Sequence, residues 1–108
     1  MLRLRLSERA IQSSWATIGL VDCDTGRLIE KYARHADAER AMQFLKLVGV
    51  ARYGTELGGA ATHELAAQTC AEFYGHRQYE KLPGQDLEVL HEAVRCSLEE
   101  AGKSRRGA

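Results

Sequence analysis

The pair His63-Glu64 is the first feature that suggests chemistry, because a His-Glu pair on a helix opens the HExxH zinc motif. The fifth position of that motif is Ala67, so the second histidine ligand is missing. The pair is therefore expected to be structural, with Glu64 near the N-terminus of a helix and His63 half-exposed.

The other histidines and cysteines have spacings that do not suit a shared metal ion. His63 and Cys70 are about two helical turns apart, roughly 10 Å, whereas zinc lies about 2.0–2.3 Å from each ligand. His91 and Cys96 would point to different sides of a helix. We expect no metal site and no cofactor, and we expect Cys70 and Cys96 to be buried as small hydrophobic side chains.

Catalytic groups also lack their usual surroundings in the sequence. No serine or cysteine stands in a nucleophile-elbow motif. The glycine-rich run 54–59 has neither of the phosphate-binding glycine spacings, and no lysine follows it to reach a phosphate. The sequence therefore predicts no catalytic residues, and we expect that the protein is not an enzyme.

Basic and aromatic residues of the first half remain, and they indicate recognition. Four arginines could share the exposed face of a sheet and meet a phosphate backbone or an acidic protein surface, although solvated strand positions explain them as well. Trp15, Tyr32 and Tyr53 are either core residues or, where exposed, candidate hot spots of an interface. The predicted partner-binding residues are Arg3, Arg5, Arg9, Trp15, Arg27 and Tyr53.

A sheet must position these residues, because the first half has the patterns of strands. Residues 2–6 alternate leucine with arginine, which is the period of a half-buried strand. The runs 11–21 and 27–32 are separated by Asp24-Thr25-Gly26. This arrangement is typical of a hairpin whose type I turn ends in a G1 bulge, with the glycine at positive φ.

A helix is expected to follow the hairpin, because residues 36–48 carry an amphipathic apolar stripe and Gly49 suits a C-terminal stop. Residues 50–60 hold three of the ten glycines, which indicates a connector with a short strand over 50–53. This connector is the best candidate for a mobile segment.

Two further helices are predicted in the second half. The first covers residues 61–74, with Thr62 as its N-cap. The second begins near Gln85 or Asp86 and ends at Gly102. Its second, partly apolar face (Val89, Ala93, Cys96) is explained equally well by burial in the core or by pairing in a homodimer.

Length and composition complete the expected architecture. A chain of 108 residues has room for one core, so we predict a single α+β domain over 1–102 and a flexible basic tail over 103–108. The predicted fold is a three-stranded antiparallel sheet, made of the N-terminal strand and the hairpin, followed by three helices packed on one face.

Charge and cysteine usage indicate the compartment and exclude two classes of protein. Fifteen Lys and Arg balance fifteen Asp and Glu, which argues against a strongly basic nucleic-acid binder and against an acidic nucleic-acid mimic. The three cysteines form no CxxC motif, and the sequence shows neither a signal peptide nor an apolar run of membrane-spanning length. We therefore expect a cytoplasmic protein without a membrane partner.

The second half also resembles a helical module of small phage and prophage accessory proteins. In that module a helix with His-Glu and an aromatic residue precedes an aromatic-x-x-Leu-Pro link and a final HxAVxxxL helix. The matching residues within 61–100 are His63, Glu64, Tyr74, Gly75, Tyr79, Leu82, Pro83, Ala93, Val94 and Leu98. Tyr79 stands where such families usually have tryptophan, and the first half has no counterpart. By analogy, the resemblance implies the class of proteins that block host machinery, which includes anti-CRISPR proteins.

The sequence therefore favours a non-enzymatic phage or mobile-element protein that inhibits or modulates a host protein or ribonucleoprotein complex in the host cytoplasm. The alternative is a nucleic-acid-binding transcriptional or accessory regulator that uses the basic face of the sheet. A homodimer is compatible with either function.

Overall fold

The computed structural model describes residues 2–8, 14–49 and 58–106, with no side-chain description beyond residue 100. Arg9, Tyr53 and the strand predicted over 50–53 lie outside these ranges. The elements are β1 (Leu4–Ser7), β2 (Ile18–Asp22), β3 (Leu28–Tyr32), α1 (His35–Val48), α2 (Gly59–Tyr74), the 3-10 turn η2 (Tyr79–Lys81) and α3 (Gly84–Arg106). The predicted order of a three-stranded sheet followed by three helices is confirmed.

The strands form one antiparallel sheet in the order β1-β2-β3. Leu6 pairs with Leu20, and Leu20 pairs with Glu30 on the other side. Cross-strand partners point to the same face of a sheet, so these three side chains face the same way. This is the face that the helices cover, and Leu20 on it is completely buried.

The turn of the β2–β3 hairpin has the predicted glycine geometry. The backbone N–H of Gly26 donates to the carbonyl of Asp22 at 2.8 Å, and Gly26 has φ +73°. The Asp22 carboxylate accepts the N–H of Asp24 at 2.9 Å. The sheet register also shifts between Leu20 and Val21, where Leu20 pairs with Glu30 and Val21 pairs with Leu28.

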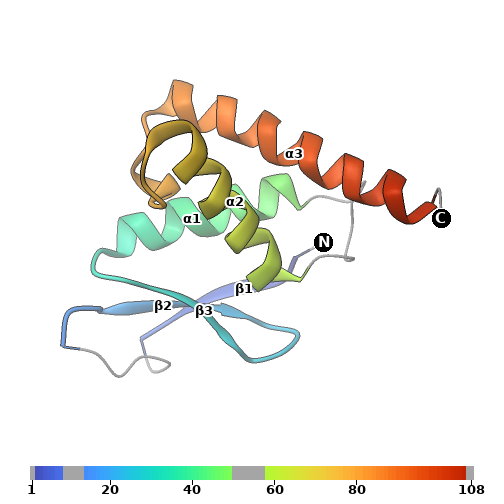
Figure 1. The fold of residues 1–108 in the computed structure, drawn as a ribbon. Helices are drawn as coiled ribbons and strands as arrows, with labels where there is room; N and C mark the ends of the chain where they lie inside the picture. Colours follow the sequence, from blue (N-terminus) through green and yellow to red (C-terminus); the bar gives the residue numbers. More distant parts are fainter. Residues whose placement is uncertain (1, 9–13, 50–57, 107–108) are drawn as a thin grey trace.

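The helices form two layers on one face of the sheet (Figure 1). α1 packs on all three strands and α2 packs on β3, whereas α3 packs mainly on α1 and α2. The stripe predicted for α1 is the observed one, with Ala38, Ala41, Leu45 and Val48 buried. No helix in the described part of the chain is both long and apolar enough to cross a membrane.

Two predicted helix ends are wrong. Gly58, not Thr62, occupies the N-cap of α2, and the Thr62 hydroxyl donates to the Gly58 carbonyl at 2.9 Å from within the first turn. α3 continues through Gly102 to Arg106. A glycine inside a helix costs only about 1 kcal/mol, and the basic residues beyond it suit the C-terminal end of a helix dipole. Residues 103–106, predicted as tail, are therefore helical.

The outer face of α3 is not buried in the core. Val89 is 52% exposed and Cys96 is exposed, while Leu90, Val94 and Leu98 fill the core side. Burial is thus confirmed for Cys70 and wrong for Cys96, because the helix turns that side away from α1 and α2. The homodimer stays a prediction.

Two glycine substitutions, both at positions without steric crowding, test the backbone strain at Gly26. A Cβ at Gly26 or at Gly84 would meet no atom within 4 Å, but only Gly26 has a positive φ. We expect Gly26→Ala to lower the free energy of unfolding by about 1 kcal/mol, and Gly84→Ala to leave it unchanged or raise it slightly. Urea denaturation measures both, and equal effects would contradict a backbone origin.

Candidate functional site

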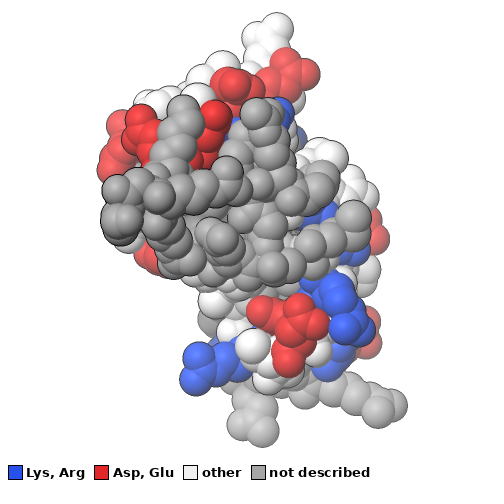
Figure 2. Space-filling view, turned by 90° about the vertical axis from the view of Figure 1, so that its right-hand side faces the viewer, with Lys and Arg blue, Asp and Glu red and all other residues white. Residues whose placement is uncertain are grey.

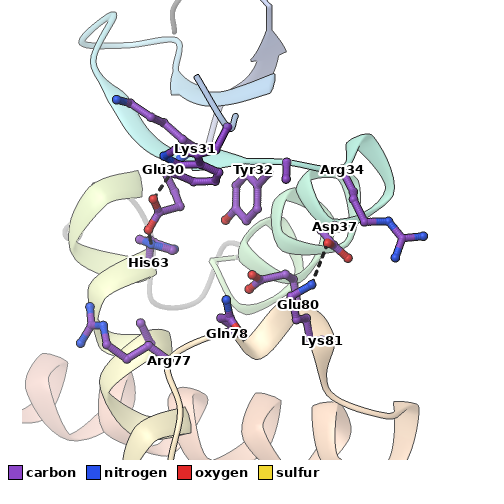
Figure 3. Close-up of a pocket in the computed structure, with 13 residues that line it drawn as sticks. Glu30, Lys31, Tyr32, Arg34, Asp37, His63, Arg77, Gln78, Glu80 and Lys81 are labelled. Carbon is purple, nitrogen blue, oxygen red and sulfur yellow. Dashed lines mark hydrogen bonds and ion pairs between the residues drawn. The ribbon is translucent and has the colours of Figure 1, made fainter. Parts of the chain in front are cut away.

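A polar cleft of about 390 Å³ opens where β3, α1, α2 and η2 meet (Figure 3). Its walls carry Glu30 and Tyr32 from β3, Asp37 from the first turn of α1, His63 from α2, and Glu80 from η2. This volume is at the lower end of the usual range for small-ligand pockets. The cleft therefore has room for one small ligand or one side chain.

The chain returns to the cleft through a sharp turn after α2. Gly75 ends α2 in the left-handed conformation with φ +81°, and its N–H donates to the Ala71 carbonyl. The Arg40 guanidinium of α1 then donates two hydrogen bonds of 2.8 Å, to the carbonyls of Glu80 and Leu82. Arg40 therefore fixes the backbone of η2, and with it the side chain of Glu80.

A hydrogen-bonded chain of three side chains forms one wall. His63 Nδ1 lies 2.7 Å from the Tyr79 hydroxyl, and His63 Nε2 lies 3.3 Å from Glu30 Oε2. Both contacts are satisfied by a neutral imidazole whose Nε2–H donates to Glu30 and whose Nδ1 accepts from Tyr79. His63 is 7% exposed, so the expectation of a half-exposed histidine is wrong: the ring packs inward against Tyr79.

The same chain of side chains ends in the core. Tyr79 is completely buried, and its ring lies 5.1 Å from that of Phe44 between centroids. Tyr79 does not line the cleft, and its hydroxyl is already engaged by His63. The network holds α2, β3 and η2 together, and the hydrogen bond from His63 lowers the pKa of Glu30, against the opposing effect of partial burial.

Glu80 is the unusual group of the cleft. It is 7% exposed, and its carboxylate forms no ion pair with the described residues. Burial raises the pKa of Glu80, and repulsion from Asp37 adds to this effect, while a hydrogen bond from its own backbone N–H opposes both. In Figure 3 its carboxylate points into the centre of the cleft. A buried carboxylate without an ion pair costs stability.

Tyr32 is a second buried polar group without a partner. Its side chain is 4% exposed, and its hydroxyl makes no hydrogen bond in the described part of the chain. Burial raises the pKa of Tyr32, with further contributions from the negative charges of Glu80 and Glu30. Figure 3 shows this hydroxyl between Glu80 and His63. A hydroxyl without a hydrogen-bond partner and a carboxylate without an ion pair among the described residues thus line the same cleft.

The predicted partner-binding residues separate into two places. Trp15 lines the cleft and is 59% exposed. Arg3 and Arg27 lie at the hairpin end of the sheet, where Arg3 contacts Asp24 at 3.2 Å, and Arg5 is exposed on β1. Tyr32, which the sequence left open, is buried at the opposite end of β3. Among the described residues, the structure therefore does not bring Trp15 together with Arg3, Arg5 or Arg27.

Charges at the hairpin end are mixed. Figure 2 looks toward this end, and in its lower part acidic side chains lie between basic ones, without a continuous positive patch among the described residues. The salt bridge between Arg3 and Asp24 is one such pair, and both of its side chains are largely exposed. Exposed pairs of this kind add little to stability, but they reduce the local positive potential.

Sequence reasoning missed Glu30 and Glu80, and it did not predict that His63 and Tyr79 are joined beside the cleft. Their partners are distant in the chain, so no local spacing reveals them. One signal was present: the Tyr79-x-x-Leu82-Pro83 step combines two apolar side chains with a proline, and both Tyr79 and Leu82 prove to be core residues.

Two further observations concern metal-binding groups and other hollows of the described chain. The residues that the structure describes include no group of three or more His, Cys, Asp or Glu placed to hold a metal ion. A second hollow of about 610 Å³ lies between α1 and the start of α3, and the charged side chains that line it are exposed or half-exposed.

Comparisons of the chain with protein-family models, curated proteins and solved structures give no match.

The hydrogen bond between His63 and Tyr79 is testable by Tyr79→Phe. The substitution keeps the packing of the ring and leaves His63 Nδ1 buried without a partner, so the free energy of unfolding should fall by about 1–3 kcal/mol. Urea denaturation measures the loss. Tyr74→Phe is the control, because its hydroxyl makes only a 3.4 Å contact, and little change is expected. Equal losses would contradict the assignment.

Glu80→Gln should stabilise the protein at neutral pH. The raised pKa of Glu80 means that the folded state favours the protonated form, so the wild type loses stability as the pH rises above the usual value of 4.5. We expect a gain on the order of 1 kcal/mol at pH 7 that disappears below about pH 4.5. Thermal unfolding across this pH range checks it, with exposed Glu72→Gln as the control. A loss of stability at pH 7 would contradict the prediction.

Proposed function

We propose that this protein is a binding protein that acts without turnover, by seating part of a larger macromolecular partner in the cleft between β3, α1, α2 and η2. One observation carries the proposal. Trp15, a residue type that dominates binding energy in interfaces, is 59% exposed at a cleft that also holds buried polar groups. A core tryptophan would be covered, so this position favours recognition.

The arrangement of the polar groups supports binding over catalysis. His63 is held between Glu30 and Tyr79, and the Tyr79 hydroxyl is buried in the core. A general base must reach the proton that it removes, and both nitrogens of this ring are already engaged by the protein. The cysteine of the core, Cys70, has a pKa raised by burial, which opposes formation of the nucleophilic thiolate.

The partner class of the proposal comes from the resemblance of residues 61–100 to small phage and prophage accessory proteins. We propose a host protein or ribonucleoprotein complex as the target, and inhibition or modulation as the outcome, as in anti-CRISPR proteins. The cleft supports this class only in one respect: it offers a defined docking point on a chain of 108 residues.

The alternative, a nucleic-acid-binding regulator, has less support from the surface. It requires a basic face, and the arginines at the hairpin end lie beside acidic side chains (Figure 2). Phosphate contacts gain their energy from clustered positive charge. The nucleic-acid-binding regulator is therefore kept as one of the outcomes that the capture experiment below can show.

Capture of a partner tests the proposed function. Tagged full-length protein is incubated with bacterial lysate, with and without nuclease, and bound protein is identified by mass spectrometry. We expect a stoichiometric protein partner that survives nuclease, and Trp15→Ala should reduce its recovery about tenfold or more, since a tryptophan hot spot often contributes at least 2 kcal/mol. The same preparation tests the expectation that the protein is not an enzyme, because the captured partner should show no turnover.

The controls distinguish the cleft from other surfaces. Leu47→Ala removes an equally exposed apolar side chain from α1, outside the cleft, and should leave capture unchanged. Loss of capture in Arg5→Glu but not in Trp15→Ala would move the interface to the basic face of the sheet. Recovery of nucleic acid alone, lost after nuclease, would replace the proposal with the regulator.

A further inference from the structure

We propose that the cleft binds a primary ammonium group at the end of an alkyl chain, and that this group is a lysine side chain of the partner protein. The inference rests on the proposed function for the origin of the lysine, and on the side chains of the cleft for its chemistry. Glu80 contributes a buried carboxylate without an ion pair among the described residues, Tyr32 contributes a buried hydroxyl without a hydrogen bond there, and Glu30 lies beside them on β3 (Figure 3).

The ionised Glu80 carboxylate can only accept hydrogen bonds, so a charged donor suits it best, and the Tyr32 hydroxyl can accept a hydrogen bond from the same donor. Glu80 has no ion pair with the described residues, and the Tyr32 hydroxyl has no hydrogen bond there. A cation in contact with Glu80 would replace the missing partner and offset the cost of its burial. An anion would instead add to the repulsion that Asp37 already exerts on Glu80.

The basic residues around the cleft leave this position open. Lys81 contacts Asp37 at 3.1 Å, and Arg77 contacts Glu64 at 2.7 Å. Figure 3 shows the side chains of Lys31, Arg34 and Arg77 extending away from the centre of the cleft. The acidic groups thus face inward and most of the basic groups outward, although the whole chain is neutral.

The size and shape of the site indicate an organic cation. The acidic groups of the cleft are not among any set of three that could close on a metal ion in the described residues. A cavity of about 390 Å³ suits an extended side chain, whose methylene groups would pack on the exposed ring of Trp15.

Lysine fits these acceptors better than arginine does. In Figure 3 the Glu80 carboxylate and the Tyr32 hydroxyl lie on one side of the cleft, and the Glu30 carboxylate lies on the other, where it contacts His63 and the backbone N–H of Lys31. An ammonium has three donors directed to different sides, which matches separate acceptors. A guanidinium is planar and pairs best with one carboxylate through two parallel bonds.

The experiment is an NMR titration of the isotope-labelled full chain with N-acetyl-lysine methylamide. We expect saturable shifts at residues that line the cleft, such as Tyr32, Ala67 and Glu80, with a dissociation constant on the order of 1 mM. N-acetyl-norleucine methylamide has the same alkyl chain without the charge and should not bind. Equal binding of the norleucine probe would overturn the proposal.

Glu80→Gln should weaken binding of the lysine probe about tenfold, because it removes the charged acceptor. Unfolding cannot explain that loss, since the same variant is expected to be the more stable one. The matched control is Glu72→Gln, which removes the same charge from the exposed surface of α2 and should leave binding unchanged. Equal weakening in both variants would overturn the site, because it would reveal only a general attraction to a negative surface.

Two other probes test the identity of the group. Tighter binding of N-acetyl-arginine methylamide than of the lysine probe would overturn the assignment to an ammonium. Tighter binding of 1,4-diaminobutane would assign the site to a free amine and overturn the partner lysine as its source. If neither lysine nor the diamine binds while Trp15→Ala still abolishes partner capture, the inference fails and the proposed function stands.

Discussion

The hydrogen bond between His63 and Tyr79 is the contact on which the rest of the cleft depends. It joins α2 to η2 at 2.7 Å, and the second nitrogen of His63 extends the connection to Glu30 on β3. Arg40 adds the link from α1 to η2. Because four elements are fixed around one point, the side chain of Glu80 is held in the cleft, where it lacks the ion pair that a mobile loop would let it find.

This arrangement makes the folded protein less stable than it would be if the Glu80 carboxylate had an ion pair. The core beneath it is apolar and closely packed around Leu20, Leu45 and Leu90, which leaves a reserve of stability that can offset an unpaired carboxylate. Protein sites that violate the rule of polar pairing are often those kept for a ligand. A buried acid beside an unpaired phenol is such a violation, and its position next to an exposed tryptophan favours recognition as the explanation.

The sequence was sufficient for features that local pattern controls, and insufficient for those that depend on tertiary contacts. The Leu2 to Leu6 alternation, the turn at Gly26 and the stripe of α1 each follow from periodicity or from glycine geometry, and the structure confirms them. The cleft depends on contacts between residues such as Glu30 and His63, 33 positions apart. No spacing rule covers such a pair, so the sequence alone predicts a half-exposed His63, whereas the structure buries it.

The overall composition also gives no indication of the cleft, because it reports only the total charge of the chain. Equal numbers of acidic and basic residues give no net charge, and this balance argued against strong electrostatic recognition. In the folded chain, Lys81 pairs with Asp37 and Arg77 pairs with Glu64. The carboxylate of Glu80 lies inside the cleft without an ion pair among the described residues. In a partly buried site the local dielectric is low, so one unpaired charge there has more effect on a ligand than several exposed pairs. Recognition by a protein of zero net charge can therefore depend on a single buried carboxylate without an ion pair rather than on the total charge.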